Sequence, residues 1–142
     1  MSQLLVDHAL LIESVREGGA LALSYFHCGV KHWDKGYDDP VSEADHAVND
    51  LLRQKLLDRR PQYGWLSEET EDDPKRLGCR DVWVVDPIDG TRAFIQQRAE
   101  FTICAALVRD DRPVAAAVYN PAKEEFFDAV QGGGARLNGE SI

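Results

Sequence analysis

Long apolar runs, cysteines and positive charges are all scarce in this 142-residue chain, and each scarcity excludes a class of protein. No apolar run approaches the roughly 20 residues that cross a bilayer, so we expect no membrane-spanning segment. The 25 acidic residues outnumber the 16 lysines and arginines, which gives a formal net charge of −9. Nucleic-acid backbones and anionic membranes repel such a chain, so neither a nucleic-acid polymer nor a membrane is expected as a partner.

The three cysteines, Cys28, Cys79 and Cys104, are odd in number and widely spaced. This pattern predicts free thiols in a reducing compartment rather than a disulfide framework, which favours a cytoplasmic location. Cys28 and Cys104 lie in apolar stretches and are expected in the core. No basic segment followed by an apolar one opens the chain, which argues against a secretory signal.

Two helical patterns precede the strand patterns. Over residues 3–27, apolar residues recur at three- and four-residue steps, which predicts a helix with one buried face. That face consists of Leu5, Ala9, Ile12, Val15, Gly19, Ala22 and Phe26. The glycines at 18 and 19 weaken a helix by up to about 1 kcal/mol each relative to alanine, so we expect a close-packed neighbour there. A second helix, from Ser42 to about Asp58, begins at a capping box in which Asp45 follows Ser42 by three residues.

Strands are predicted at residues 63–66, 82–85, 101–108, 113–119 and 125–130. The last three are separated by short loops, which suit antiparallel hairpins. The glycine-rich stretch 131–135 lacks the lysine and hydroxyl residue of a P-loop and is interpreted as a turn. We therefore predict an α+β domain over residues 1–142, in which two N-terminal helices pack on a mostly antiparallel sheet.

The most informative stretch is residues 82–91. Its apolar, β-branched strand is predicted to end at Asp86, because Pro87 has no N–H and restricts the residue before it. Gly90 permits a sharp bend, after which a helix can begin. Two carboxylates, Asp86 and Asp89, with a bent backbone carbonyl suit a hard cation such as Mg²⁺, and a helix start attracts phosphate. On these ten residues alone, an ordinary Asp-Pro-Gly turn stays open as the alternative.

Acidic residues stand at two other element ends. Asp45 opens the second helix, and its local sequence favours a role as a helix cap. Glu68 and Glu69 follow the predicted strand at 63–66. The alternative for this pair is a solvated acidic loop, because the run of charge continues to Asp73.

Three motifs together resemble the inositol monophosphatase superfamily, whose members are magnesium-dependent, lithium-sensitive phosphomonoesterases. They are Pro-Val-Ser-Glu-Ala-Asp at 40–45, the Glu-Glu pair at 68–69 and Asp-Pro-Ile-Asp-Gly-Thr at 86–91. Their order and separations fit this family over nearly the whole chain. The resemblance implies the first half of a layered sugar-phosphatase fold, without the C-terminal α/β domain that follows it in the family.

The resemblance also implies the metal ligands. Glu68, Asp86 and the backbone carbonyl of Ile88 would hold one Mg²⁺. Asp86 would bridge to a second ion that Asp89 also holds, and the family uses two or three ions. Carboxylates are the ligands that Mg²⁺ prefers, and paired cations neutralise a phosphate dianion and activate a bound water.

The catalytic and phosphate-binding residues are implied in the same way, which favours a role for Asp45 beyond that of a cap. Asp45 and Thr91 would orient and deprotonate the attacking water. The backbone N–H groups of Gly90 and Thr91 would hold the phosphate. Lys35, which matches a basic position in the family, and Glu69 are further candidates.

The predicted function is therefore Mg²⁺-dependent hydrolysis of a small phosphorylated metabolite by a metal-activated water. Arg92–Ile95 departs from the Thr-Asn-Phe pattern of inositol monophosphatases proper. With residues 100–102 it looks more like the branch that hydrolyses 3′-phosphoadenosine 5′-phosphate, while inositol monophosphate and histidinol phosphate stay open as substrates.

The competing hypothesis is a truncated, non-catalytic half-domain that binds metal weakly and self-associates, for example as a homodimer, through an apolar face. The oxygen spacing does not fit an EF-hand calcium loop.

Overall fold

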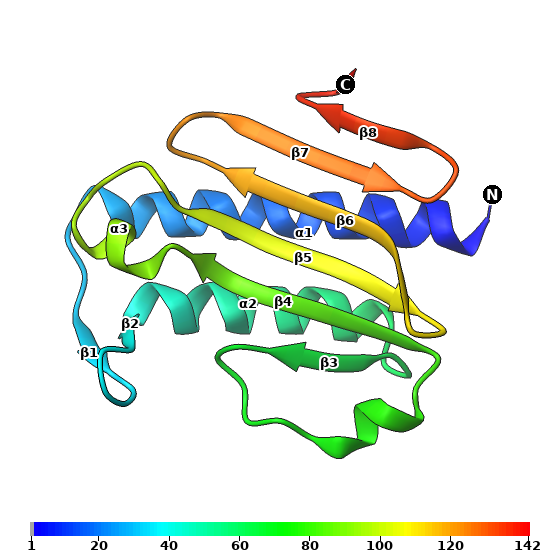
Figure 1. Cartoon of the computed structure of the whole chain (residues 1–142), viewed down its shortest axis with the longest axis horizontal. Helices are drawn as coiled ribbons and strands as arrows, with labels where there is room; N and C mark the ends of the chain where they lie inside the picture. The colour runs from blue at the N-terminus through cyan, green and yellow to red at the C-terminus, as the bar shows by residue number, and fades with distance from the viewer. Residues whose placement is uncertain (1) are drawn as a thin grey trace.

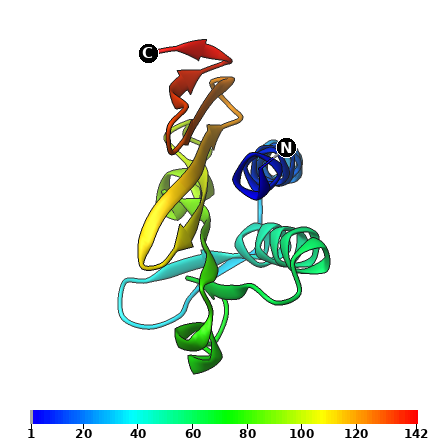
Figure 2. The ribbon, with the colours of Figure 1, turned by 90° about the vertical axis from the view of Figure 1, so that its right-hand side faces the viewer.

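The computed structural model describes residues 2–142 as two long helices on one face of a seven-stranded sheet (Figures 1 and 2). The helices are α1 (Gln3–Phe26) and α2 (Glu43–Arg59). The sheet has the order β3-β4-β5-β6-β7-β8-β9, and only the β3–β4 pair is parallel. Its strands are β3 (Gly64–Ser67), β4 (Asp81–Asp89), β5 (Thr102–Arg109), β6 (Arg112–Asn120), β7 (Glu125–Val130), β8 (Gly134–Leu137) and β9 (Glu140–Ser141).

Three smaller elements complete the fold. Strands β1 (His32–Asp34) and β2 (Pro40–Ser42) form a separate antiparallel hairpin, η1 (Pro74–Gly78) is a 3-10 turn between β3 and β4, and α3 (Thr91–Ile95) is a single short helix after β4. The predicted α+β class, the two N-terminal helices and the mostly antiparallel sheet are thus confirmed. None of the helices described here combines the length and the apolarity that a bilayer-spanning segment requires.

The core lies between the helices and the sheet. Helix α1 packs on β5 and β6, and α2 packs on β4. Strand residues alternate, so that Trp83 and Val85 of β4 face the helices and are buried, while Val84 and Asp86 face the other side. Side chains on the helix-free face, such as Val84 and Asp86, are only half-buried. The acidic residues lie where the strands of this sheet end.

The buried face of α1 differs from the predicted one. Leu5 and Ala9 are exposed, while Asp7 and His8 are buried beside Leu11. The two polar side chains are accommodated because each has a charged partner from another element, as described in the Discussion for Asp7. Apolar spacing alone could not reveal partners that lie far away in the sequence.

The Gly18–Gly19 pair does have a close-packed neighbour, but it acts through one of the two glycines. A Cβ on Gly19 would overlap the ring of Tyr119 on β6, whereas a Cβ on Gly18 would lie 3.4 Å from Leu52 and Val48. Gly19 thus lets α1 approach the sheet closely.

We expect Gly19→Ala to destabilise the chain by about 1–3 kcal/mol, because the added methyl must displace an aromatic ring in a packed core. Gly18→Ala is the matched control, and we expect a change within about 1 kcal/mol because its steric cost is offset by helix propensity. Urea unfolding of both variants measures the difference. Equal effects at the two positions would contradict this account of the helix–sheet contact.

Other predictions need correction. Strand β4 does not end at Asp86 but continues to Asp89, because a shift in register against β5 accommodates the proline within the strand. Cys28 is exposed because it follows the end of α1, and Cys104 is only half-buried because it faces the helix-free side of β5. The β1–β2 pairing and strands β8 and β9 were not predicted. The glycine-rich stretch is a turn, as predicted, and β8 begins within it at Gly134.

Candidate metal and phosphate site

The acidic residues meet where β3 and β4 end. These neighbouring strands are parallel, with Ser67 opposite Val85, so their carboxyl ends lie at the same edge. The backbone N–H of Glu68 donates to the carbonyl of Val85 at 3.4 Å, which places Glu68 beside the last part of β4. Glu68 and Asp86 line one hollow on the helix-free face, together with small apolar residues of β5 and β6 and the thiol of Cys104.

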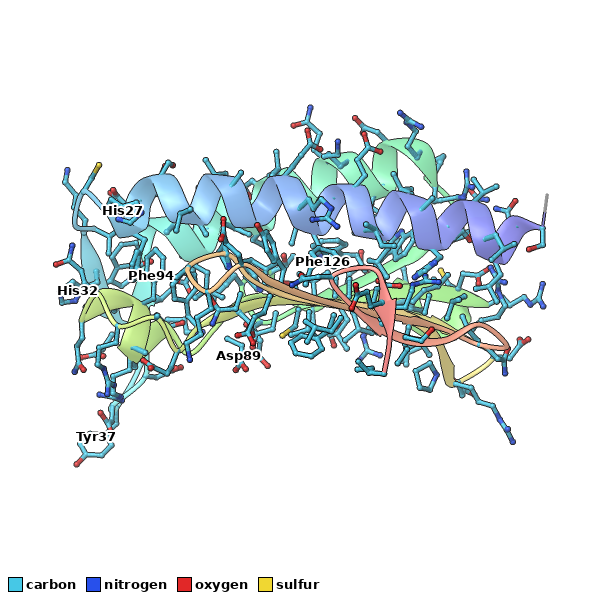
Figure 3. All side chains as sticks on the ribbon, turned by 90° about the horizontal axis from the view of Figure 1, so that it is seen from above. His27, His32, Tyr37, Asp89, Phe94 and Phe126 are labelled. Atoms are coloured by element: carbon cyan, nitrogen blue, oxygen red, sulfur yellow. The ribbon has the colours of Figure 1, made fainter. Side chains whose placement is uncertain are left out.

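The chain bends sharply after Asp86. The register of β4 against β5 shifts between Asp86 and Asp89, and Gly90 follows with φ of +88°. A Cβ at Gly90 would lie 2.6 Å from the carbonyl oxygen of Glu100, so conformation and space both require glycine here. Asp89 is exposed and projects to the side of the sheet away from α1 (Figure 3). Both aspartates are thus presented at the same strand end.

Asp45 caps α2 and also contacts Thr91. Its Oδ2 accepts hydrogen bonds from the backbone N–H and the hydroxyl of Ser42, at 2.9 and 2.6 Å, which completes the predicted capping box. Its Oδ1 lies 2.8 Å from the hydroxyl of Thr91, which is also 3.1 Å from the carbonyl oxygen of Ile88. The role of Asp45 as a helix cap is therefore compatible with its contact to Thr91, because each uses a different carboxylate oxygen.

The carboxylates influence one another electrostatically. The pKa of Asp86 is raised from 3.8 to about 6, first by burial and then by the charges of Asp89, Glu68, Asp45 and Glu69, in that order. Four carboxylates that disfavour ionisation of a fifth create a local negative potential. Such a site favours a cation, and it binds phosphate only once positive charge has been supplied.

Lys35 supplies the nearest positive group. Its ammonium nitrogen lies 3.0 Å from Oε1 of Glu69. Burial is the largest single influence on the pKa of Lys35 and lowers it, but the hydrogen bond to Glu69 and the charges of Glu69, Asp39 and Glu68 together outweigh burial, so the pKa is raised. Burial raises the pKa of Glu69, and Lys35 opposes that rise. The second oxygen of Glu69, Oε2, is buried and has no hydrogen-bond partner in residues 2–142.

The sequence did not predict the residues that hold the Glu68–Glu69 turn. Asn49 of α2 accepts from the hydroxyl of Ser67 at 2.5 Å and donates to Thr70 at 2.9 Å. The backbone N–H of Glu69 donates to the hydroxyl of Ser67 at 3.3 Å. A hydroxyl residue at each end of an acidic pair is a turn signal that could have indicated this arrangement, whereas nothing local indicated Asn49.

The donor set fits a hard divalent cation. Carboxylate oxygens, the Ile88 carbonyl and the unpartnered Oε2 of Glu69 are the kinds of ligand that Mg²⁺ takes, whereas a soft metal prefers thiolates and imidazoles. Across residues 2–142, no three histidine, cysteine or acidic side chains converge into a ready ligand cage. The carboxylates thus form an open acidic patch at the strand ends.

Comparison with known proteins gives a consistent result. A sequence model described as "Inositol monophosphatase family" matches residues 6–142. An inositol-1-monophosphatase of Rhizobium meliloti is 43% identical over 104 residues, covering 73% of this chain and 39% of that protein. A histidinol-phosphatase of Chlorobaculum parvum is 34% identical over 137 residues, covering 96% of this chain and 52% of that protein. A 3′(2′),5′-bisphosphate nucleotidase, CysQ, of Aggregatibacter actinomycetemcomitans is 34% identical over 136 residues, with coverage of 93% and 51%.

A solved structure supports the same fold. The extragenic suppressor protein suhB of Bartonella henselae matches with a TM-score of 0.88 at 28% identity, covering 94% of this chain and 52% of that one. The present chain therefore spans about half the length, or less, of the curated relatives that it matches.

Proposed function

Because this chain belongs to the inositol monophosphatase family, we propose that it forms the metal-binding half of a Mg²⁺-dependent phosphomonoesterase. The observation that carries the proposal is the placement of Glu68, Asp86 and Asp89 at the neighbouring carboxyl ends of β3 and β4, where the pKa of Asp86 is raised to about 6. A phosphate monoester dianion resists attack by hydroxide, so its hydrolysis needs charge neutralisation first. An anionic patch of oxygen ligands can concentrate the cations that do this.

The proposed metal ligands are Glu68, Asp86, Asp89 and the Ile88 carbonyl, for two or three Mg²⁺ ions. When bound, such ions polarise the phosphoryl group and lower the pKa of a coordinated water. The protein presents these oxygens on the ends of two paired strands, which fixes their separation better than a free loop would.

Asp45 and Thr91 are the proposed general-base pair. The 2.8 Å separation of their oxygens lets the Thr91 hydroxyl donate to Asp45 and keep a lone pair toward a water. The capping hydrogen bonds from Ser42 hold the other oxygen of Asp45, so the carboxylate cannot rotate freely. The N–H groups of Gly90 and Thr91 are the proposed phosphate donors.

The test is a phosphate-release assay on the protein that carries this chain together with a counterpart of the relatives' other half. The substrates are 3′-phosphoadenosine 5′-phosphate, inositol 1-phosphate, histidinol phosphate and fructose 1,6-bisphosphate, each with and without Mg²⁺. We expect release that needs Mg²⁺ and is inhibited by lithium. Release that is unchanged by a metal chelator would contradict the proposal.

For the substrate we propose a nucleoside bisphosphate ahead of histidinol phosphate and inositol monophosphate. The support is the Arg92–Ile95 segment, and one of the relatives is a bisphosphate nucleotidase. Relatives named for the other two substrates match as well, so the panel compares all three under one set of conditions. A kcat/KM that is highest for inositol 1-phosphate would reverse this order.

A further inference from the structure

The β1–β2 hairpin lies beside the acidic strand ends but is not part of the main sheet. Figure 1 places it next to α3, and Figure 2 shows it reaching past the sheet to the helix-free side. Each strand has three residues, and all of β1 is exposed. A two-stranded ribbon of this size is marginally stable in water, so contacts with the rest of the protein must determine its position.

One of those contacts comes from the residue after Thr91. Nη2 of Arg92 lies 3.0 Å from Oδ1 of Asp38 and 3.4 Å from the backbone carbonyl oxygen of Asp38. Asp38 is in the turn of the hairpin, with φ of +52°. The guanidinium group therefore holds both the side chain and the backbone of a turn residue, from a helix that starts at the acidic site.

The turn transmits this contact to Lys35. The backbone N–H of Lys35 donates to the carbonyl of Asp39, the neighbour of Asp38, at 2.8 Å. The Lys35 ammonium then reaches Glu69, beside the proposed metal ligand Glu68. These contacts thus connect α3, through the hairpin turn, to the end of β3.

We propose that Arg92 is a positioning residue, which acts through Asp38 to hold the β1–β2 hairpin so that the Lys35 ammonium is fixed against Glu69. This role rests on the proposed function, since Lys35 matters for catalysis only if Glu68 and Glu69 belong to a metal site. Exposed ion pairs are individually weak, and the effect of losing one is correspondingly a few-fold.

The first experiment measures hairpin opening in the 142-residue chain without metal. A lysine-specific protease cleaves the Lys35–Gly36 bond only when Lys35 leaves Glu69, and the initial rate follows the open population when reclosing is fast. We expect Arg92→Gln and Asp38→Asn each to raise this rate roughly two- to fivefold. The double variant should match Arg92→Gln, because once Arg92 is gone Asp38→Asn has no further contact with that position to remove.

Arg80→Gln is the matched control. Arg80 makes an ion pair with Asp110 at 3.1 Å, with side chains as exposed as those of Arg92 and Asp38, but on the far end of β4. We expect no change in the Lys35–Gly36 rate for Arg80→Gln, and Arg92→Lys should retain most of the protection. Equal rates in wild type, Arg92→Gln and Arg80→Gln would overturn the proposal.

The second experiment asks whether Arg92 acts through Lys35. The half-saturating Mg²⁺ concentration is measured by thermal shift in wild type, Arg92→Gln, Lys35→Met and the double variant. We expect Arg92→Gln to change it in the same direction as Lys35→Met but by less, and to have no effect once Lys35 is methionine. An undiminished effect in the Lys35→Met background would contradict positioning. Absence of any Mg²⁺ response in wild type would instead count against the proposed function, while the proteolysis result would stand by itself.

Discussion

Replacing Asp86 with asparagine should stabilise the metal-free chain and abolish its response to Mg²⁺. At pH 7.5 the wild-type carboxylate is ionised among four other carboxylates. Its raised pKa of about 6 reflects the unfavourable free energy of ionising it there. One pKa unit corresponds to about 1.4 kcal/mol, and solvent screens this half-buried group in part. We therefore expect a gain of about 1–2 kcal/mol in the free energy of unfolding for Asp86→Asn. Urea unfolding in a chelator measures it.

The same variant should show no rise in thermal midpoint with Mg²⁺, whereas the wild-type midpoint should rise because the ion binds the folded state. When this chain is joined to the C-terminal half of a relative to give an active phosphatase, phosphate release by Asp86→Asn should fall to the level seen without Mg²⁺. A gain in stability accompanied by a loss of metal binding identifies a functional carboxylate, because an ordinary structural ion pair would lose stability instead.

The pH dependence provides an internal check. The folded-state pKa of Asp86 lies above its ordinary value of 3.8, so the folded state binds the extra proton between these two values. The contribution of Asp86 to the free energy of unfolding therefore falls as the pH rises from about 4 through 6. Asp86→Asn lacks this titrating group and should not show this fall. The difference between the two should vanish near pH 4. Asp111→Asn, on the distant β5–β6 turn, is the charge-matched control and should show no such dependence.

Asp7→Ala should produce the largest loss of stability in this chain. The Asp7 carboxylate is fully buried, and its Oδ1 accepts from Arg60 at 2.6 Å. Its Oδ2 accepts from the Tyr63 hydroxyl at 2.5 Å and from Arg109 at 3.2 Å. Arg109 is also held by Asp81 at 2.5 Å. Removal of the central anion leaves two mostly buried guanidinium groups partly unpaired.

We expect a cost of about 3–5 kcal/mol, the range found when one partner of a buried ion pair is removed. Arg80→Ala removes an exposed pair with Asp110 and serves as the control, with an expected cost below about 1 kcal/mol. Denaturant unfolding of both variants separates buried from exposed charge. A cost for Asp7→Ala no larger than that of the control would show that the network does not stabilise the fold.

The order of the elements and the identity of the acidic motifs could be predicted from the amino-acid sequence. Both rest on local chemistry, such as the apolar periods, the Ser42–Asp45 box and the bend that Gly90 permits. Helix α1, helix α2 and the three hairpin strands are found within a residue or two of their predicted ends. The family followed from three motifs that match in type, order and separation.

Which of these residues face one another depends on the packing of elements that are far apart in the sequence. The burial of Asp7 depends on Arg60 and Arg109, which are 53 and 102 positions away, and no local period can indicate such partners. The tertiary structure also showed that Asp45 uses one oxygen for its cap and the other for Thr91. It likewise gave Arg92 a partner in the β1–β2 hairpin, whose pairing was not predicted. Side-chain pairing between elements is set by how the helices and sheet pack, and that geometry exists only after the chain has folded.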